Sequence, residues 1–360
     1  MSQTFLPPRP RVIVFGGYGV FGSIVARELV QRGVPVTIAG RDGRKGESLA
    51  RELGSECSAV EANLADRASC SQALNGHVIA VHCAGPFAEM DDSLLDACLE
   101  HGCHYVDIAD DRAYVARVQQ YDERFSRAGL TAAYGCSSLP SISLALAQHA
   151  RAESAVPVEG VRVGLFIGHD NPKGDAAVRS ATRMLGRPIA AQQGALVGFR
   201  DWTIVPLPPP IGRRPMLNFE TPDYDLLPRL LGAREVIVNV GFESRLVTAA
   251  FGCFARCAPA IGRRVLPWLA AISGPLRHFG TSCGVVFAEL VFADGSRRSA
   301  AMVARRDGQR LAALPCVYVV ERLARGEACA AGAHSGGEIL GHAALLERLV
   351  QDGFSLHDER

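Results

Sequence analysis

The stretch RVIVFGGYGVFGSIVARELVQRG, residues 11–33, contains an apolar run, a glycine-rich turn and an amphipathic segment in direct succession. Residues 11–15 predict a buried strand, and the residues after the turn predict a helix. Gly17, Gly19 and Gly22 have the spacing G-x-G-x-x-G, in which the first permits a tight turn, the second leaves room for a pyrophosphate and the third lets helix and strand pack closely. Free amides and the helix dipole favour an anion there. We therefore expect a dinucleotide to be bound by Gly17, Tyr18, Gly19, Val20, Phe21 and Gly22.

The end of the second predicted strand, VPVTIAGRD (residues 34–42), indicates which dinucleotide is bound. Enzymes selective for the unphosphorylated cofactor place an acidic residue here, whereas this chain has Gly40 and Arg41. The Arg41 guanidinium can pair with a 2′-phosphate and stack on adenine, and Arg44 adds positive charge nearby. We therefore expect NADP. Two alternatives stay open, since Asp42 could reach a ribose and Arg41 could be an ordinary solvated arginine.

Composition limits the remaining choices. The 360 residues are 48% hydrophobic, which is enough for a large core and two domains, and a formal net charge of +1 argues against nucleic-acid binding. The 11 cysteines form no C-x-x-C pair and no zinc-type cluster with histidine, so we expect reduced thiols, a cytoplasmic location and no metal site. The polar, proline-rich N-terminus lacks the apolar core of a signal peptide. No tyrosine is followed four residues later by lysine, which excludes a Tyr-x-x-x-Lys mechanism.

Strand and helix patterns alternate through the first 140 residues and predict a doubly wound parallel sheet, a Rossmann fold. The expected strands are residues 11–15, 34–39, 58–63, 77–87, 103–111 and 130–141, and the expected helices are residues 45–53, 67–74, 93–101 and 114–128.

The motifs GGYGVFG, AGR, CAGPF, HYVDIADD and GCSSLPSISLAL follow one another in the first 150 residues and resemble those of the saccharopine dehydrogenase-like oxidoreductases. The resemblance implies an NADP-binding Rossmann domain (1–140), an inserted α+β substrate and dimerisation domain (141–315) and C-terminal helices that return to the Rossmann domain (316–360). It also implies NADP chemistry at a carbon centre, with the nicotinamide beside residues 83–86. It fixes no substrate, because the family acts on imines and on enoyl groups.

The ends of the fourth, fifth and sixth strands supply the other candidate site residues. A strand that ends in Ala-Gly-Pro presents backbone with little side-chain bulk, so it can line a dinucleotide, or it can be an ordinary exit from a strand. Hydroxyls after the sixth strand could cap a helix beginning near Ile142 or bind the cofactor. The cofactor contacts expected from these loops are Cys83, Ala84, Gly85, Pro86, Ser137 and Ser138.

Tyr105 and Asp107 alternate along the fifth strand and therefore point to one face near its carboxyl end, where a substrate would enter. They are the expected catalytic acid and base. An aspartate at a strand end also often caps the next helix, and Asp110 or Asp111 could do so before Ala113.

From Val158 the pattern changes to strands without regular crossover helices, which predicts a mixed or antiparallel sheet. The sequence Ala-Asp-Gly-Ser (293–296) predicts a hairpin, and PLPPPIGRRP (206–215) predicts an irregular loop that cannot be a central strand. Edges of this sheet are the expected surface of a homodimer.

Residues 246–276 are long and apolar enough to raise the question of a membrane span. Arg256, Arg263 and Arg264 argue against it, and Pro259 and Pro267 are expected to break the segment into short helices. Such helices could cover an apolar substrate tunnel, pack on a partner subunit or lie on a membrane surface.

Together these patterns predict an NADP-dependent oxidoreductase that transfers hydride to or from a C=N, C=C or C=O bond of a small metabolite bound between two domains. The alternative is a redox-sensing regulatory protein that binds NADP without turnover.

Overall fold

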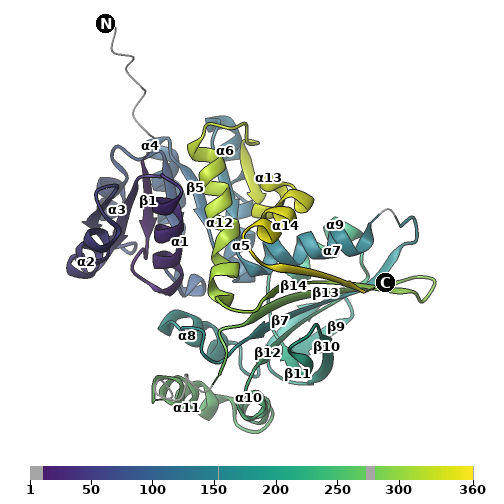
Figure 1. Cartoon of the computed structure of the whole chain (residues 1–360). Coiled ribbons are helices and arrows are strands. Elements are labelled where there is room, and N and C mark those ends of the chain that lie inside the picture. The colour runs from purple at the N-terminus through teal and green to yellow at the C-terminus, as the bar shows by residue number, and fades with distance from the viewer. Residues whose placement is uncertain (1–10, 153, 273–279, 360) are drawn as a thin grey trace, which may run out of the picture.

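The computed structural model describes residues 11–152, 154–272 and 280–359. Residues 12–134 and a strand near the C-terminus build a parallel sheet, sheet A (Figure 1). Its strands are β1 (Val12–Phe15), β2 (Val36–Gly40), β3 (Cys57–Glu61), β4 (Ile79–His82), β5 (His104–Asp107), β6 (Thr131–Tyr134) and β15 (Gly332–Ser335). The order β15-β6-β5-β4-β1-β2-β3 confirms the predicted doubly wound topology. Ligands of such sheets bind at the carboxyl ends of the strands, where the order reverses between β1 and β4.

Helices connect these strands, and two of them begin and end at the predicted residues. They are α1 (Val20–Gln31), α2 (Gly43–Leu53), α3 (Arg67–Leu74), α4 (Ser93–His101), α5 (Arg112–Gln119) and α6 (Asp122–Ala128). The single helix predicted over residues 114–128 is wrong, because α5 and α6 are separate. The amides of Gln120 and Tyr121 bond to carbonyls three residues back, at Arg117 and Val118, so the first helix tightens and ends there.

The second domain is built on a seven-stranded sheet, sheet B. Its strands are β7 (Val158–Ile167), β10 (Thr203–Leu207), β11 (Gly212–Asn218), β12 (Glu235–Phe242), β13 (Gly284–Phe292), β14 (Arg297–Ala304) and β16 (Ser355–Glu359), and a small hairpin is formed by β8 (Pro188–Ala191) and β9 (Gly194–Val197). The order is β10-β11-β12-β7-β13-β14-β16, with β7 and β12 parallel and the other pairs antiparallel, as expected for a mixed sheet. The predicted hairpin at residues 293–296 joins β13 to β14.

One strand of sheet B corrects the sequence analysis. Residues 212–215, expected to be irregular loop, belong to β11, which is second from the edge of the sheet. Pro215 is tolerated there because β12 pairs only with Leu217 and Asn218. No hydrogen bond to β12 is therefore lost through the missing N–H of the proline.

The helices of the second domain are α7 (Ser143–Arg151), α8 (Asp175–Arg183), α9 (Asp223–Leu231), α10 (Arg245–Cys257) and α11 (Pro259–Ile272). Two short helices are thus confirmed for the segment predicted over 246–276, of which residues 273–276 lie outside the described residues. Pro267 does not break α11, contrary to expectation. The buried Leu266 and the close packing of Gly262 on Phe254 hold that helix in place.

The C-terminal part of the chain joins both domains. Helix α12 (Gly308–Ala324) packs against α1, and β15 then extends sheet A beside β6. Helices α13 (Gly336–Leu340) and α14 (His342–Gln351) lead back to β16, which pairs with β14 at the edge of sheet B. One apolar core therefore runs from sheet A through α7 and α12 to one face of sheet B.

Candidate functional site

The turn between β1 and α1 requires glycine at several positions. Gly16 has φ +71°, and a Cβ atom there would lie 2.8 Å from the Ala84 Cα. A Cβ on Gly22 would lie 2.2 Å from the Gly16 carbonyl oxygen. The sequence analysis assigned the tight turn to Gly17, but the left-handed residue is Gly16, while a Cβ on Gly17 would instead meet the Val14 carbonyl oxygen at 2.8 Å. The glycine doublet was the signal that could have identified Gly16.

The N-terminus of α1 is open. Gly19 is its N-cap residue, no side chain caps the helix, and its first turn holds no acidic residue. A Cβ on Gly19 would lie 3.0 Å from the Gly16 carbonyl oxygen, so a side chain would crowd the turn. The first amides of the helix are therefore available to an anion, and the arrangement fits a pyrophosphate.

Tyr18 shapes the neighbouring surface. Its ring lies against Gly40 so closely that a Cβ there would be 2.4 Å from Tyr18 Cε1. Its hydroxyl oxygen accepts a hydrogen bond of 2.9 Å from the Asp42 amide. Glycine at the end of β2 is thus explained by the aromatic ring that covers it, a contact between residues 22 positions apart.

Asp42 has a structural partner, which bears on cofactor choice. Its carboxylate caps α2 by accepting from the Lys45 amide at 3.2 Å, and it lies 3.7 Å from Lys45 Nζ. Arg41 and Arg44 are exposed and form no ion pair with any residue that the structure describes. Asp42, which could have bound a ribose, is therefore held by Lys45, whereas Arg41 and Arg44 are available to a phosphate.

The loop after β4 lies next to the glycine turn. Ala84 packs on Gly16, and Pro86 leads into a short 3-10 helix, η1 (Phe87–Glu89). Cys83 is partly exposed at the start of this loop. Strands β1 and β4 are neighbours in the sheet, so this loop and the turn together form the edge where the order of strands reverses.

Helix α8 of the second domain covers this edge. A Cβ on Gly174, the N-cap of α8, would lie 3.4 Å from Val20 Cγ2 at the start of α1. A Cβ on Gly85 would lie 3.2 Å from the Ala176 Cβ. Helix α8 therefore lies over both the glycine turn and the loop after β4, and Figure 1 shows it below sheet A and beside sheet B.

Two ion pairs hold α8 in this position. Glu89 of η1 lies 3.7 Å from Arg179 and 4.0 Å from Arg183, both on α8. All three side chains are about half exposed, so the pairs are weak individually. They connect the loop after β4 to the helix that covers it.

Asp107 lies at the end of β5 and is fully buried. Its Oδ1 accepts hydrogen bonds from the amides of Ala109 (2.9 Å) and Gly135 (2.7 Å), which ties the loops after β5 and β6 together. Burial raises the pKa of Asp107 to about 6, although these two amides oppose the rise.

Tyr105, two residues before Asp107 on β5, is also fully buried. Its hydroxyl lies 2.8 Å from the Tyr114 hydroxyl and 3.1 Å from His82 Nδ1. Burial raises the pKa of Tyr105 well above its ordinary value and lowers the pKa of His82 to about 4. The catalytic roles expected of Tyr105 and Asp107 stay predictions, and both side chains lie beneath the surface of the site.

The residues after Asp107 reach the second domain. Asp111 caps α5 by accepting from the Tyr114 amide at 2.9 Å, which decides between the two expected caps. Arg112 binds both carboxylate oxygens of Asp225 at 2.6 Å and the Ala190 carbonyl at 2.6 Å. Asp110, between Asp107 and this bridge, is partly exposed, and burial raises its pKa to about 6 with a contribution from Asp111.

The serines after β6 are placed differently from the expectation. No side chain caps α7, and its N-cap residue is Ile142. Ser141 instead donates to the Gly135 carbonyl at 2.7 Å. Ser137 is partly exposed and Ser138 is buried, so their contacts with a cofactor stay a prediction.

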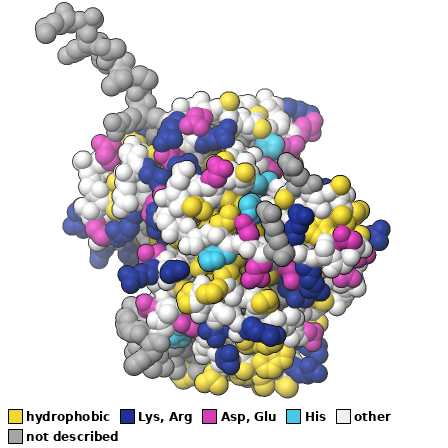
Figure 2. Space-filling view, turned by 45° about the vertical axis from the view of Figure 1, so that its right-hand side comes forward, with side chains coloured by type: hydrophobic (Ala, Val, Ile, Leu, Met, Phe, Trp, Pro, Cys, Tyr) yellow, Lys and Arg dark blue, Asp and Glu magenta, His cyan; other side chains and the backbone are white. Residues whose placement is uncertain are grey.

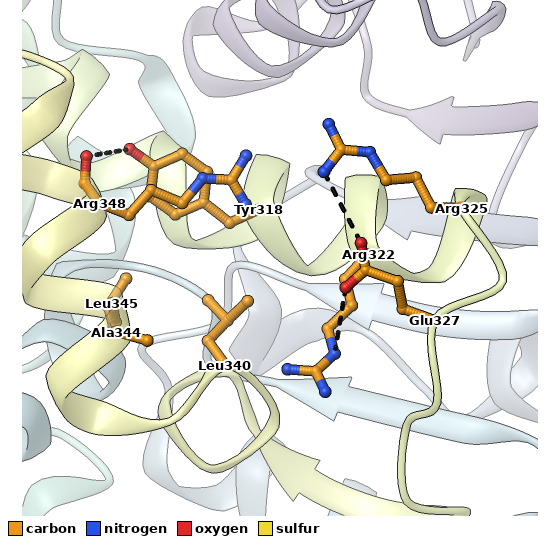
Figure 3. A pocket seen from close by; sticks show the side chains of 8 residues that line it. All are labelled: Tyr318, Arg322, Arg325, Glu327, Leu340, Ala344, Leu345 and Arg348. Atoms are coloured by element: carbon orange, nitrogen blue, oxygen red, sulfur yellow. Dashed lines mark hydrogen bonds and ion pairs between the residues drawn. The ribbon is translucent and has the colours of Figure 1, made fainter.

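A separate pocket of about 120 Å³ lies between α12 and α14 (Figure 3). Its arginines already have partners, since Arg325 and Arg348 pair with the buried Glu321, and Arg322 lies 4.0 Å from Glu327. The pocket contains no residue of the glycine turn or of the loops after β4 and β5, so it is a structural ion network. It is lined by Tyr318, Arg322, Arg325, Glu327, Leu340, Ala344, Leu345 and Arg348.

The described residues contain no group of three or more His, Cys, Asp or Glu side chains arranged to hold a metal ion. Nor does any helix among them combine the length and apolarity needed to cross a bilayer.

Comparison with known proteins identifies the N-terminal domain. Residues 12–133 match the family model described as "Saccharopine dehydrogenase NADP binding domain". The fold is similar to that of apo histidine-tagged saccharopine dehydrogenase (L-Glu forming) from Saccharomyces cerevisiae, with a TM-score of 0.69 and 10% identity over 97% of this chain and 99% of that chain.

Two curated relatives match more locally. A "Lipid droplet localized protein" of Caenorhabditis elegans is 25% identical over 144 residues, which are 36% of this chain and 34% of the relative. A "Saccharopine dehydrogenase-like oxidoreductase" of Homo sapiens is 25% identical over 150 residues, 36% of this chain and 35% of the relative. Each match thus spans about a third of the curated relative. Residues 12–133 therefore match the NADP-binding domain of the saccharopine dehydrogenase family, and the whole chain has the fold of a saccharopine dehydrogenase.

Proposed function

We propose that the protein is an NADP-dependent oxidoreductase that transfers hydride to or from a C=N, C=C or C=O bond of a small metabolite held between its two domains. The observation that carries the proposal is the uncapped N-terminus of α1, which lies at a glycine turn and is covered by α8. The backbone of the turn itself requires glycine at position 22, whereas Gly19 also leaves no side chain over the open amides of α1, where a pyrophosphate would lie.

Residues of the first domain would hold the cofactor along the carboxyl edge of sheet A. The open amides of α1 would bind the pyrophosphate, and Arg41 with Arg44 would bind the adenosine 2′-phosphate. Residues 83–86 would face the nicotinamide, with Ser137 and Ser138 on the far side. When bound, NADP supplies or accepts the hydride, and the protein's contribution is to orient the acceptor carbon and exclude water.

We assign the proton-handling role to Asp110. Its partly exposed carboxyl lies at the carboxyl end of β5, two residues before Arg112, which binds Asp225 of the second domain. A carboxyl with a pKa of about 6 exchanges its proton readily near neutral pH, as a general acid or base must. Asp107 and Tyr105, which are buried, would act as positioning residues by fixing the loops after β5 and β6.

The test is a screen of NADPH oxidation, followed by its absorbance, over imines, enoyl thioesters and keto acids, with wild-type protein and with Asp110→Asn. We expect one class to be reduced and the variant to lose about 10²-fold in kcat or more, because general acid–base catalysis contributes that much. Glu47→Gln, an exposed position on α2, is the matched control and keeps full activity.

The alternative is an NADP-binding sensor without turnover. Tight binding of NADPH with no oxidation by any compound class would favour it, and a failure to bind either nucleotide would contradict both functions. A homodimer that uses the edges of sheet B and a cytoplasmic location are further parts of the proposal, which light scattering and cell fractionation would test.

A further inference from the structure

The chain has two tryptophans, and both side chains are unusually exposed. Trp202 and Trp268 are each 62% exposed. Leu246 is 83%, Ile261 57% and Ile204 50% exposed. Among the side chains that the structure describes, these five residues include most of the large hydrophobic groups in solvent, and all lie between residues 202 and 268. We call these five residues the apolar face.

The apolar face is presented by a well-packed part of the second domain. On the inner side of α10, the Phe251 ring lies 4.8 Å from the Phe199 ring and 5.2 Å from the Phe242 ring. On the inner side of α11, Gly262 packs on Phe254, and Leu266 is buried. The exposed groups therefore do not result from missing contacts, because both helices bury their opposite sides.

The outward residues of α11 follow helical spacing. Ile261, Arg264 and Trp268 are separated by three and four residues, so they share one side of the helix, and all three are exposed. On α10, Leu246 and Cys253 are exposed at a spacing of two turns. Each helix thus carries an apolar outer side flanked by arginine.

Strand β10 adds to the same end of the domain. Ile204 pairs with Pro215, and residues paired across antiparallel strands point to the same side of the sheet. Leu217, two residues further along β11, also points to that side and contacts α10, where a Cβ on Gly252 would lie 3.4 Å from Leu217 Cδ2. Ile204 therefore lies on the α10 side of sheet B.

The charge on helices α10 and α11 has one sign, whereas the acidic Asp201 is exposed beside Trp202. Residues 244–288 contain no Asp or Glu. Arg245, Arg256 and Arg264 are exposed and form no ion pair with any residue that the structure describes. Figure 2 shows apolar side chains together with Lys and Arg side chains at the lower end of the molecule, where Figure 1 places α10 and α11.

We propose that the apolar face and these three arginines bind the surface of a lipid layer that contains anionic headgroups. Short helices with exposed Trp and Leu on one side and arginine beside them lie in the headgroup region, where the indole rings are partly buried and the guanidinium groups meet phosphates. Helices α10 and α11, of 13 and 14 residues, are too short to span and suit this interfacial position. A second copy of the chain is a less suitable partner for α10 and α11, because their arginines would face each other across a two-fold axis.

The two tryptophans make the test direct, since both are exposed and Trp268 lies on the outer side of α11. The full chain is mixed with vesicles of phosphatidylcholine alone and with vesicles of phosphatidylcholine and phosphatidylserine. We expect sedimentation with the anionic vesicles and a blue shift of tryptophan emission, and much weaker binding to phosphatidylcholine alone. Equal binding to both kinds of vesicle would contradict the proposal that the arginines bind anionic headgroups.

Matched variants separate the face from the rest of the surface. Leu246→Ser combined with Ile261→Ser removes apolar groups but keeps both tryptophans as probes, and we expect at least tenfold weaker binding. Arg256→Glu and Arg264→Glu should each weaken binding to anionic vesicles about fivefold or more. Val78→Ser and Arg234→Glu alter exposed residues elsewhere and should leave binding unchanged.

Two outcomes would overturn the proposal. One is a protein, shown by circular dichroism to be folded, that neither sediments with anionic vesicles nor shifts its emission. The other is a wild-type dimer that the Leu246→Ser and Ile261→Ser double variant converts to monomer, which would assign the apolar face to a second copy of the chain. Neither result depends on the enzymatic activity, so the two proposals fail separately.

Discussion

Gly16 and Ala84 touch across neighbouring strand ends, and a Cβ atom on Gly16 would lie 2.8 Å from the Ala84 Cα. The left-handed φ of +71° at Gly16 and this contact together fix the geometry of the proposed pyrophosphate site.

Gly16→Ala should therefore destabilise the protein and weaken NADPH binding. The substitution adds backbone strain of about 1–2 kcal/mol and a steric collision with Ala84. Gly33→Ala is the control, because Gly33 has φ +76° with no atom within 4 Å of an added Cβ. In urea unfolding we expect the free energy of unfolding of the control to fall only by the backbone strain, and we expect the control to bind NADPH normally. Equal losses in the two variants would show that the contact with Ala84 is unimportant.

Arg41→Asp should change the cofactor preference. An arginine that pairs with a 2′-phosphate contributes about 1.5–3 kcal/mol, so we expect NADPH binding to weaken about tenfold to a hundredfold while NADH binding improves. Calorimetric titration with both nucleotides measures this, and Arg51→Asp on the exposed part of α2 should change neither affinity. An unchanged preference for NADPH would remove Arg41 from the site.

Asp107→Asn should alter how stability depends on pH. The pKa of Asp107 is raised to about 6 in the folded state from about 3.9 when unfolded, so the folded protein holds this proton more tightly. The protonated carboxyl contributes about 3 kcal/mol to the free energy of unfolding below about pH 4, and this contribution is lost as the pH rises through about 6. Asparagine keeps the Oδ1 acceptor for Gly135 and cannot ionise. Urea unfolding from about pH 4 to 7 should therefore show the wild type losing stability relative to the variant, and parallel curves would contradict the assignment.

Glu89→Gln should speed the release of NADPH. The change removes the two ion pairs with Arg179 and Arg183, which are half exposed, so we expect less than about 1 kcal/mol of lost stability. Helix α8 would then leave the glycine turn more often, and the dissociation rate measured by stopped-flow fluorescence should rise. Glu100→Gln, which breaks an exposed pair with Arg67 away from the site, serves as the comparison. Identical dissociation rates in these two variants would argue against α8 as a cover.

The sequence was sufficient for features that depend on local pattern. The order of the first six strands of sheet A and the helices between them, the mixed sheet and the two helices after Leu246 follow from apolar periodicity and glycine or proline positions, whereas β15 was missed in a segment expected to be helical. Asp111, which caps α5, was one of the two residues expected to do so, but the local pattern could not choose between Asp110 and Asp111.

Features that depend on contacts distant in sequence could not be predicted. The need for glycine at position 40 comes from the Tyr18 ring, and the cover over Gly85 comes from Ala176, 91 positions later. Burial of Tyr105 and Asp107 follows from the packing of the loops above them, which the alternating pattern of β5 does not contain. Likewise, Pro215 fits in β11 because β12 stops short of it, and that depends on register.

The path of the backbone limits how the molecule can open. It passes from sheet A to sheet B after β6, returns through α12 to β15, and passes to sheet B again before β16. Three such connections, with a shared core, oppose a wide separation of the two halves. A nucleotide would therefore enter and leave by a local displacement of one short helix, which makes the residence time of the cofactor a property of α8 rather than of a hinge.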